Sequence, residues 1–128
     1  VNKLKKDNII VEADVLAEKI MDCILDNGYL NPDFLMDDFD VFQNCRMDKN
    51  MFGKNSNFYF NIQFFEGEKL LKKISAGDLS IEKDCEISRN VVARYYAKCS
   101  LKKAFAIYQN KNLKIIVTGG SKQTGIKL

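Results

Sequence analysis

The four cysteines, at positions 23, 45, 85 and 99, are the residues of this chain best suited to chemistry. A cysteine nucleophile usually needs a histidine base, and the 128 residues contain no histidine. Zinc sites tend to use closely spaced pairs of ligands, whereas these cysteines lie 22, 40 and 14 residues apart. Two interpretations remain, namely two disulfides in an oxidising compartment or buried free thiols in a cytosolic protein, and the sequence favours the disulfides.

Four cysteines allow three pairings, and the intervals favour Cys23 with Cys45 and Cys85 with Cys99. The first bond would tie the end of a helix to the segment after a second helix, and the other would clamp the middle of a sheet. In the chain-entropy description each loop of this size adds about 3 kcal/mol to stability. Such bonds indicate an extracytoplasmic domain, because the cytosol keeps thiols reduced.

Other groups that bind ligands or act as acids and bases give weaker signals. Residues 48–59 resemble a calcium loop at Asp48, but Phe52 and Tyr59 occupy positions that need oxygen ligands. Asp37 and Asp40 are the best candidates for catalytic carboxylates, yet no residue pairs with them convincingly. Residues 119–125 contain glycines and a lysine without the ending of a phosphate-binding loop. We therefore expect no catalytic residue, no cofactor and no metal site, and a protein that is not an enzyme.

The charge is divided unevenly along the chain. Residues 1–68 hold 7 basic and 13 acidic side chains, while residues 69–128 hold 13 basic and 4 acidic ones, which makes the first part acidic and the second basic. Nearly all of the cations are lysines, and the only arginines are Arg46, Arg89 and Arg94. Because recognition of phosphates and bases depends strongly on arginine, we expect a solubilising lysine surface and no nucleic-acid partner.

The first element that must position these residues is an amphipathic helix over residues 9–27, with Gly28 as its cap. Four acidic residues follow one another on its polar side, at Asp14, Glu18, Asp22 and Asp26. Like charges at this spacing oppose helix formation by about 0.2 to 0.5 kcal/mol per pair. The stripe is either a solvated face or a subunit contact that meets lysines from the sheet of a neighbouring copy.

The remaining pattern predicts a short helix and then strands. Asn31 and Pro32 start a helix that reaches Phe39, and an irregular stretch covers residues 44–57. Alternation of apolar and polar residues predicts strands at 57–65, 69–75, 91–99, 104–108 and 113–118, although residues 91–99 also suit a helix. We expect one α+β domain over residues 1–118, with both helices packed on a mostly antiparallel sheet of four or five strands, and a flexible tail at 119–128.

A resemblance to a known family rests on this order of elements. The helix ends in the sequence Cys-Ile-Leu-Asp-Asn-Gly-Tyr-Leu-Asn, a phenylalanine-rich helix leads to Cys45, and Phe-Tyr-Phe-Asn-Ile follows in a strand. From about residue 9 to 118 the chain resembles the head domains of pilin-like proteins of prokaryotic surfaces, especially the archaeal pilin-like and TadE-like pseudopilin groups. The similarity is one of pattern and involves no diagnostic motif.

The resemblance implies a structural or surface-display role outside the cytoplasm. In that family an apolar helix anchors the subunit in the membrane and then packs in the filament core. The chain itself holds no such apolar run, so we expect the anchor upstream of Val1, with Lys3, Lys5 and Lys6 just outside the membrane. The acidic stripe would then contact other copies or other surface subunits.

A second interpretation comes from another class of protein. A helix packed on a sheet is also typical of binding modules of cystatin-like or nuclear-transport-factor-like shape, which hold a peptide or ligand against the sheet. Tyrosines on the strands would form the binding surface, at Tyr59, Tyr95, Tyr96 and Tyr108. Strand tyrosines more often serve as half-buried packing.

Overall fold

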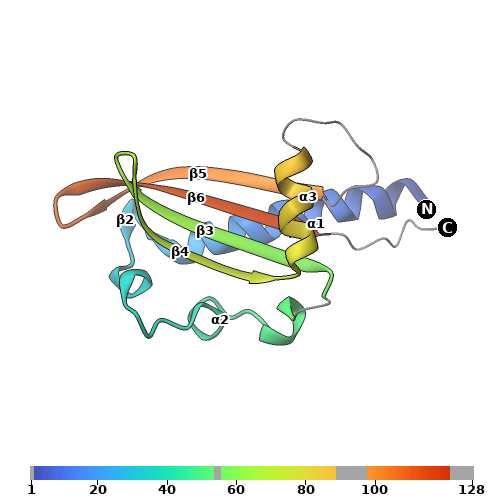
Figure 1. Ribbon diagram of the computed structural model, residues 1–128, viewed down its shortest axis with the longest axis horizontal. Coiled ribbons are helices and arrows are strands. Elements are labelled where there is room, and N and C mark those ends of the chain that lie inside the picture. The colour runs from blue at the N-terminus through green and yellow to red at the C-terminus, as the bar shows by residue number, and fades with distance from the viewer. Residues whose placement is uncertain (1, 54–55, 89–97, 122–128) are drawn as a thin grey trace.

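The computed structural model describes residues 2–53, 56–88 and 98–121, and these residues contain one six-stranded sheet. Figure 1 shows a helix on each side of this sheet. Helix α1 (Asn2–Ile24) lies behind the sheet in this view, and α3 (Leu79–Ser88) crosses the front near one end. A connecting segment with three short helices follows α1: η1 (Pro32–Leu35), α2 (Val41–Asn44) and η2 (Lys49–Phe52). The predicted α+β class is confirmed.

The sheet differs from the predicted one in size and in the direction of one pair. Its order is β1-β2-β5-β6-β3-β4. The strands are β1 (Leu25–Asp26), β2 (Tyr29–Leu30), β3 (Phe58–Glu66), β4 (Lys69–Gly77), β5 (Lys98–Tyr108) and β6 (Lys111–Ser121). Strands β2 and β5 pair in parallel, whereas the other neighbours are antiparallel. The sheet is thus mixed and six-stranded, and the prediction of a mostly antiparallel sheet with four or five strands is wrong.

A tight turn explains the two strands that the sequence analysis missed. Asn27 and Gly28 both have positive φ angles, of 52° and 87°, which is the geometry of a two-residue hairpin turn. The turn pairs Leu25 with Leu30 and stops α1 at Ile24, three residues before the predicted end. Gly28 therefore belongs to a hairpin and is not the cap of the helix.

The predicted helix from Pro32 to Phe39 is divided in two. Asn31 accepts a hydrogen bond from the backbone N–H of Asp33, as expected for a cap, but the 3-10 helix that follows ends at Leu35. A second helix, α2, starts after Asp40, whose side chain accepts hydrogen bonds from two backbone N–H groups. Because the Asp40 side chain caps the N–H groups of Phe42 and Gln43, a new helix starts after Asp40, close to the predicted end of the first helix.

The predicted strands at 57–65 and 69–75 correspond to the β3–β4 hairpin. Those at 104–108 and 113–118 lie inside β5 and β6, which are longer and join through a two-residue turn at Gln109 and Asn110. Most of the predicted strand at 91–99 lies outside the described residues, as do residues 122–128 of the predicted tail. Gly119, Gly120 and Ser121, which we placed in that tail, are the buried end of β6.

Helix α3 was not predicted. The Asp78 side chain accepts hydrogen bonds from the N–H and the hydroxyl of Ser80, which is a typical helix start. Within the helix, Ile81 and Cys85 lie one turn apart and are buried against the sheet together with Tyr59. These three residues form a small second core on the front face.

The main core lies between the sheet and α1. Alternate residues of β3 and β6 point to this inner face and are buried, including Phe60, Ile62 and Val117. They meet one side of α1, formed by Ala13, Ala17, Ile20 and Ile24. The connecting segment closes the core with aromatic residues, at Phe34, Phe39, Phe42 and Phe52.

A glycine sets the distance between α1 and the sheet. A Cβ atom at Gly119 of β6 would lie 2.7 Å from the backbone oxygen of Ala13 and 3.1 Å from the backbone nitrogen of Ala17. Any side chain there would meet the backbone of the helix, which has less freedom to move than a side chain. The absence of a side chain on Gly119 therefore allows α1 to lie directly on β6.

Candidate interaction surfaces

Both predicted cysteine pairs form disulfides. Cys23 in the last turn of α1 bonds to Cys45, directly after α2, and their Cα atoms are 5.6 Å apart. Cys85 in α3 bonds to Cys99 near the start of β5, with a Cα separation of 5.7 Å. All four cysteines are therefore joined, which leaves no thiol for a nucleophile or a metal ligand. The bonds are typical of proteins in oxidising compartments.

The carboxylates considered for chemistry have structural roles or stand exposed. Asp40 starts α2, and Asp48 accepts a hydrogen bond from the N–H of Asn50 at the start of η2. Phe52, within the calcium-like stretch, is buried in the core. Asp37 is exposed. Across residues 2–53, 56–88 and 98–121, no group of three or more cysteines or carboxylates is arranged to hold a metal ion.

The acidic stripe of α1 is divided by the structure. Asp14, its first member, accepts hydrogen bonds from the hydroxyl of Ser100 at 2.9 Å and from the Lys102 ammonium at 2.8 Å. Both partners belong to β5 of the same chain and point toward the helix side of the sheet. Part of the predicted subunit contact is thus used inside the molecule, to hold α1 against β5.

We expect the Asp14→Asn variant to unfold at a lower temperature than the parent chain at neutral pH. Hydrogen bonds from Lys102 and then Ser100 lower the pKa of Asp14 below its ordinary value of 3.8. The contribution of the carboxylate is therefore complete above pH 3.8 and is lost as the pH falls through the folded-state pKa. The effect should be small, because the side chains are partly exposed and salt screens the pair.

Thermal unfolding measured across acidic pH checks this expectation. The two melting curves should converge at low pH, where both chains carry an uncharged group at position 14. The Asp22→Asn variant is the matched control, since Asp22 lies on the exposed side of the same helix. A difference that stays constant down to the lowest pH would contradict the role of the ionised carboxylate.

The rest of the acidic stripe is exposed to solvent. Glu18 and Asp22 are exposed on α1, and Asp26 is exposed in β1. With Val15 and Lys19, the first two of these residues line an open hollow on the helix surface. We call the residues Val15, Glu18, Lys19 and Asp22 the helix ridge.

The opposite, outer face of the sheet presents a second surface. The strand register aligns its residues in rows that cross β5, β6, β3 and β4. The rows are Leu101–Thr118–Asn61–Ser75, Lys103–Ile116–Gln63–Lys73 and Phe105–Lys114–Phe65–Leu70. The rows contain apolar side chains and lysines, and none of their positions is acidic.

The most exposed part of this face lies toward the β5–β6 turn. Phe105 is 70% exposed and Leu70 is 45% exposed, which is unusual for large apolar side chains. The Lys114 ammonium lies 5.0 Å from the centre of the Phe65 ring, within the range of a cation–π contact. We call the residues Lys103, Phe105, Lys114, Ile116, Phe65 and Leu70 the outer patch.

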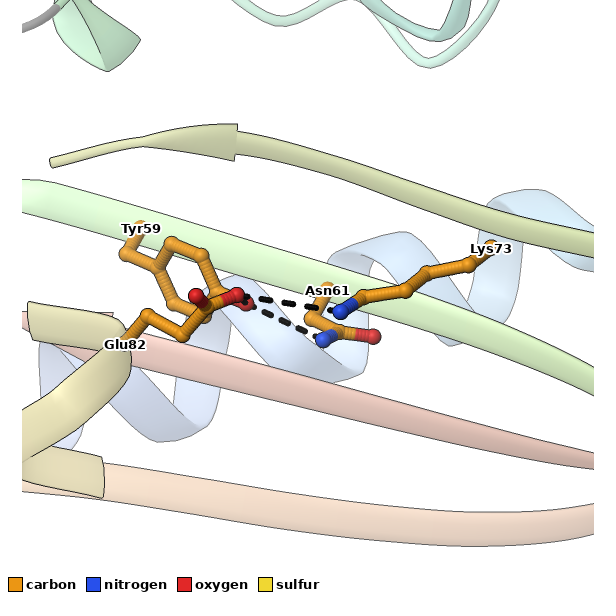
Figure 2. A network of polar contacts seen from close by, with 4 residues as sticks. All are labelled: Tyr59, Asn61, Lys73 and Glu82. Atoms are coloured by element: carbon orange, nitrogen blue, oxygen red, sulfur yellow. Dashed lines mark hydrogen bonds and ion pairs between the residues drawn. The ribbon is translucent and has the colours of Figure 1, made fainter. Parts of the chain in front are cut away.

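A polar network lies next to this patch, at the junction with α3. Figure 2 shows the Tyr59 hydroxyl between Glu82 and Asn61. The hydroxyl donates to Glu82 at 2.8 Å and accepts from the Asn61 amide at 3.0 Å. Lys73 lies 3.8 Å from the same carboxylate oxygen of Glu82. The network connects α3 to β3 and β4.

Replacing Tyr59 with phenylalanine should lower the free energy of unfolding by about 1 kcal/mol, because it removes a hydroxyl that both donates and accepts. Tyr59 is only 2% exposed, so water would not fully replace the lost partners. Urea unfolding measures the change. Tyr108→Phe is the control, because this half-buried ring packs against the other side of the sheet. Equal losses in the two variants would contradict a specific role for the network.

The tyrosines of the binding-module interpretation do not gather on one surface. Tyr59 is buried under α3, and Tyr108 packs against the main core on the inner face. Tyr95 and Tyr96 lie outside the described residues. The exposed aromatic side chain of the outer face is instead Phe105.

The sequence contains a signal for the outer patch in the alternation that begins at Leu101. From Leu101 onward, exposed Lys103, Phe105 and Ile107 alternate with residues that face the helix. The predicted strand at 104–108 omits the first part of this alternation, which lies inside β5. A longer strand would have placed Phe105 and its neighbours together on one face.

Among the described residues, none of the helices combines the length and the apolar character required to cross a membrane. The chain matches no protein-family model, no curated protein and no solved structure.

Proposed function

We propose that this chain is the head domain of a pilin-like subunit, a structural protein of a prokaryotic cell surface without enzymatic activity. The observation that carries the proposal is the position of α1. The helix packs on the inner face of the sheet, and its N-terminal turns extend past the end of the sheet (Figure 1). A helical anchor joined at this end would leave the head along the axis of α1 and would disturb none of the described contacts.

The two disulfides support a location outside the cytoplasm. One bond joins the C-terminal end of α1 to the connecting segment through Cys23, and the other joins α3 to β5 through Cys85. A head exposed at a cell surface benefits from such covalent links, because they raise the cost of unfolding where chaperones are scarce. The proposal includes a membrane-anchored precursor whose apolar segment precedes Val1.

An experiment in the source cells tests this function. An antibody raised against the 128-residue chain would be used to follow the product of the intact gene in intact cells and in filaments sheared from their surface. We expect protease added to intact cells to remove the signal, and alkylation under non-reducing conditions to find no free thiol. A product that resists protease until the cells are broken and carries four alkylatable thiols would overturn the proposal.

The open edge of β5 favours a second candidate function, a binding module for an extended peptide. In the described part of the chain, β2 is the only strand that borders this edge, and it pairs there through Tyr29 and Ile107. Residues 100–106 of β5 thus border no further strand among those described, and a peptide strand added there would lie beside the outer patch. A chain that binds extended peptides while remaining monomeric and intracellular would favour this alternative.

A further inference from the structure

We propose that the outer patch of one copy docks on the helix ridge of a second copy, so that the chain associates with itself head to tail. The inference rests on the proposed function, in which subunits assemble, and it names the two surfaces that meet. The outer patch lies on the open face of the sheet, and the helix ridge lies on the side of α1 that points away from it.

Charge complementarity identifies the second copy as the occupant. The outer patch contributes the cations Lys103 and Lys114, and no acidic residue stands in its rows. The helix ridge contributes two exposed carboxylates, Glu18 and Asp22, against one cation, Lys19, and a further exposed carboxylate, Asp26, follows in β1. Opposite charges on two faces of the same molecule favour contacts between copies and disfavour the contact of like faces.

Each of the two surfaces also presents an exposed apolar side chain beside charged ones. The helix ridge surrounds an open hollow in which Val15, 53% exposed, supplies apolar surface between charged residues. Phe105 is 70% exposed and has Lys103 on the same face of its own strand. A ring that packs on Val15 would bury apolar surface on both partners and would bring its neighbouring lysine near Glu18 or Asp22.

Asp14 explains why the contact uses only part of the acidic stripe. Its carboxylate is held by Ser100 and Lys102 of its own chain and helps to fix α1 on the sheet. This internal contact keeps α1 in a set position on the sheet. Glu18 and Asp22 are then the exposed carboxylates of α1 that a partner can meet.

The geometry of the contact has a consequence for the assembly. Helix α1 lies behind the sheet (Figure 1), and the outer patch is on the face of the sheet that α1 does not cover, so each copy offers one surface of each kind. When two copies meet through two different surfaces, each copy keeps one unused surface. Further copies can therefore add, and the assembly extends into a ring or a filament. A head-to-tail contact of this kind suits a subunit that builds a polymer.

Sedimentation velocity of the 128-residue chain at increasing concentration tests the proposal. The wild-type chain should associate, more strongly at low salt than at high salt. The paired changes Lys103→Glu with Lys114→Glu should weaken association about tenfold or more, and Glu18→Lys with Asp22→Lys should do the same. The chain with all four changes should associate again, because the charges are opposite once more.

Two further variants separate this contact from general effects of charge and folding. Lys49→Glu with Lys69→Glu changes the net charge equally on exposed residues outside the outer patch, and it should leave association unchanged. Phe105→Ser removes the exposed ring and should weaken association while the melting temperature stays close to that of the parent chain. Each variant is used only after its disulfides and its melting curve match those of a folded chain.

Several results would overturn the contact. A wild-type chain that remains monomeric at every concentration would do so, and so would reversed variants that associate as well as the wild type. A monomeric chain that binds extended peptides through Phe105 would show a different occupant. Filaments on cells that persist with the reversed charges would reject this contact and leave the proposed function standing, whereas association in solution by an intracellular protein would reject the function alone.

Discussion

Removing the Cys23–Cys45 disulfide by replacing both residues with alanine is expected to lower the free energy of unfolding by about 3 kcal/mol. The bond closes a 22-residue loop that contains β1, β2, η1 and α2. Without it the unfolded chain gains conformational freedom, and the connecting segment that covers Phe60 is held by packing alone. The melting temperature should fall by roughly 10 °C or more.

Urea unfolding of the single variants separates the covalent link from the packing of the side chains. Cys23→Ala and Cys45→Ala should each lose about as much stability as the double variant, because either change opens the same loop. Cys45 is 5% exposed and Cys23 is half-buried, so a loss that came only from packing would be larger for Cys45→Ala. A double variant as stable as the parent would show that the loop is already ordered without its bond.

The Gly119→Ala variant is expected to lose roughly 2 kcal/mol, although it adds only one methyl group. The new Cβ atom would lie 2.7 Å from the carbonyl oxygen of Ala13, and the contact involves the backbone of α1 on one side and that of β6 on the other. Neither element moves easily, because α1 is fixed at Ile20 and Ile24 in the main core and β6 pairs with strands on both sides. The helix must therefore shift away from the sheet.

Gly53→Ala is the matched control for that change. Its Cβ atom would have one neighbour within 4 Å, the backbone oxygen of Asn50 at 3.9 Å, and its φ of −72° suits any residue. We expect it to leave stability unchanged or to raise it slightly, because alanine reduces the freedom of the unfolded chain. Urea unfolding of both variants gives the comparison. Equal effects at the two positions would contradict the close contact of α1 with β6.

Local signals predicted the parts of the fold that local chemistry determines. The alternation from Phe58 to Phe64 defines a half-buried strand, and Glu66 to Glu68 define its turn, since both depend on residues near in sequence. The end of α1 was misplaced because Gly28 fits both a helix cap and a hairpin turn. The choice depends on β2 pairing with β5 at Ile107, a residue far along the chain.

The roles of the acidic stripe and of α3 could not be predicted, because both depend on contacts between residues that are distant in sequence. The acidic residues of α1 look equivalent in the sequence, but it is Asp14 that bonds to Ser100 and Lys102 of β5. Helix α3 was missed because its apolar side is short and is formed mainly by Ile81 and Cys85, which pack on Tyr59. The pairing of the cysteines was predictable, since each bond joins neighbouring cysteines along the chain.

The pairing of the two disulfides also affects how they form as the protein is oxidised. The two loops neither overlap nor enclose one another, so each bond forms within its own part of the chain and in either order. A crossed pairing, such as Cys23 with Cys85, would have to close a much longer loop, at an added entropic cost of roughly 1 kcal/mol per bond. Random oxidation of the unfolded chain is therefore already biased toward the native pairs. The first bond is available as soon as Cys45 has emerged during synthesis, before the long strands β3 to β6 exist.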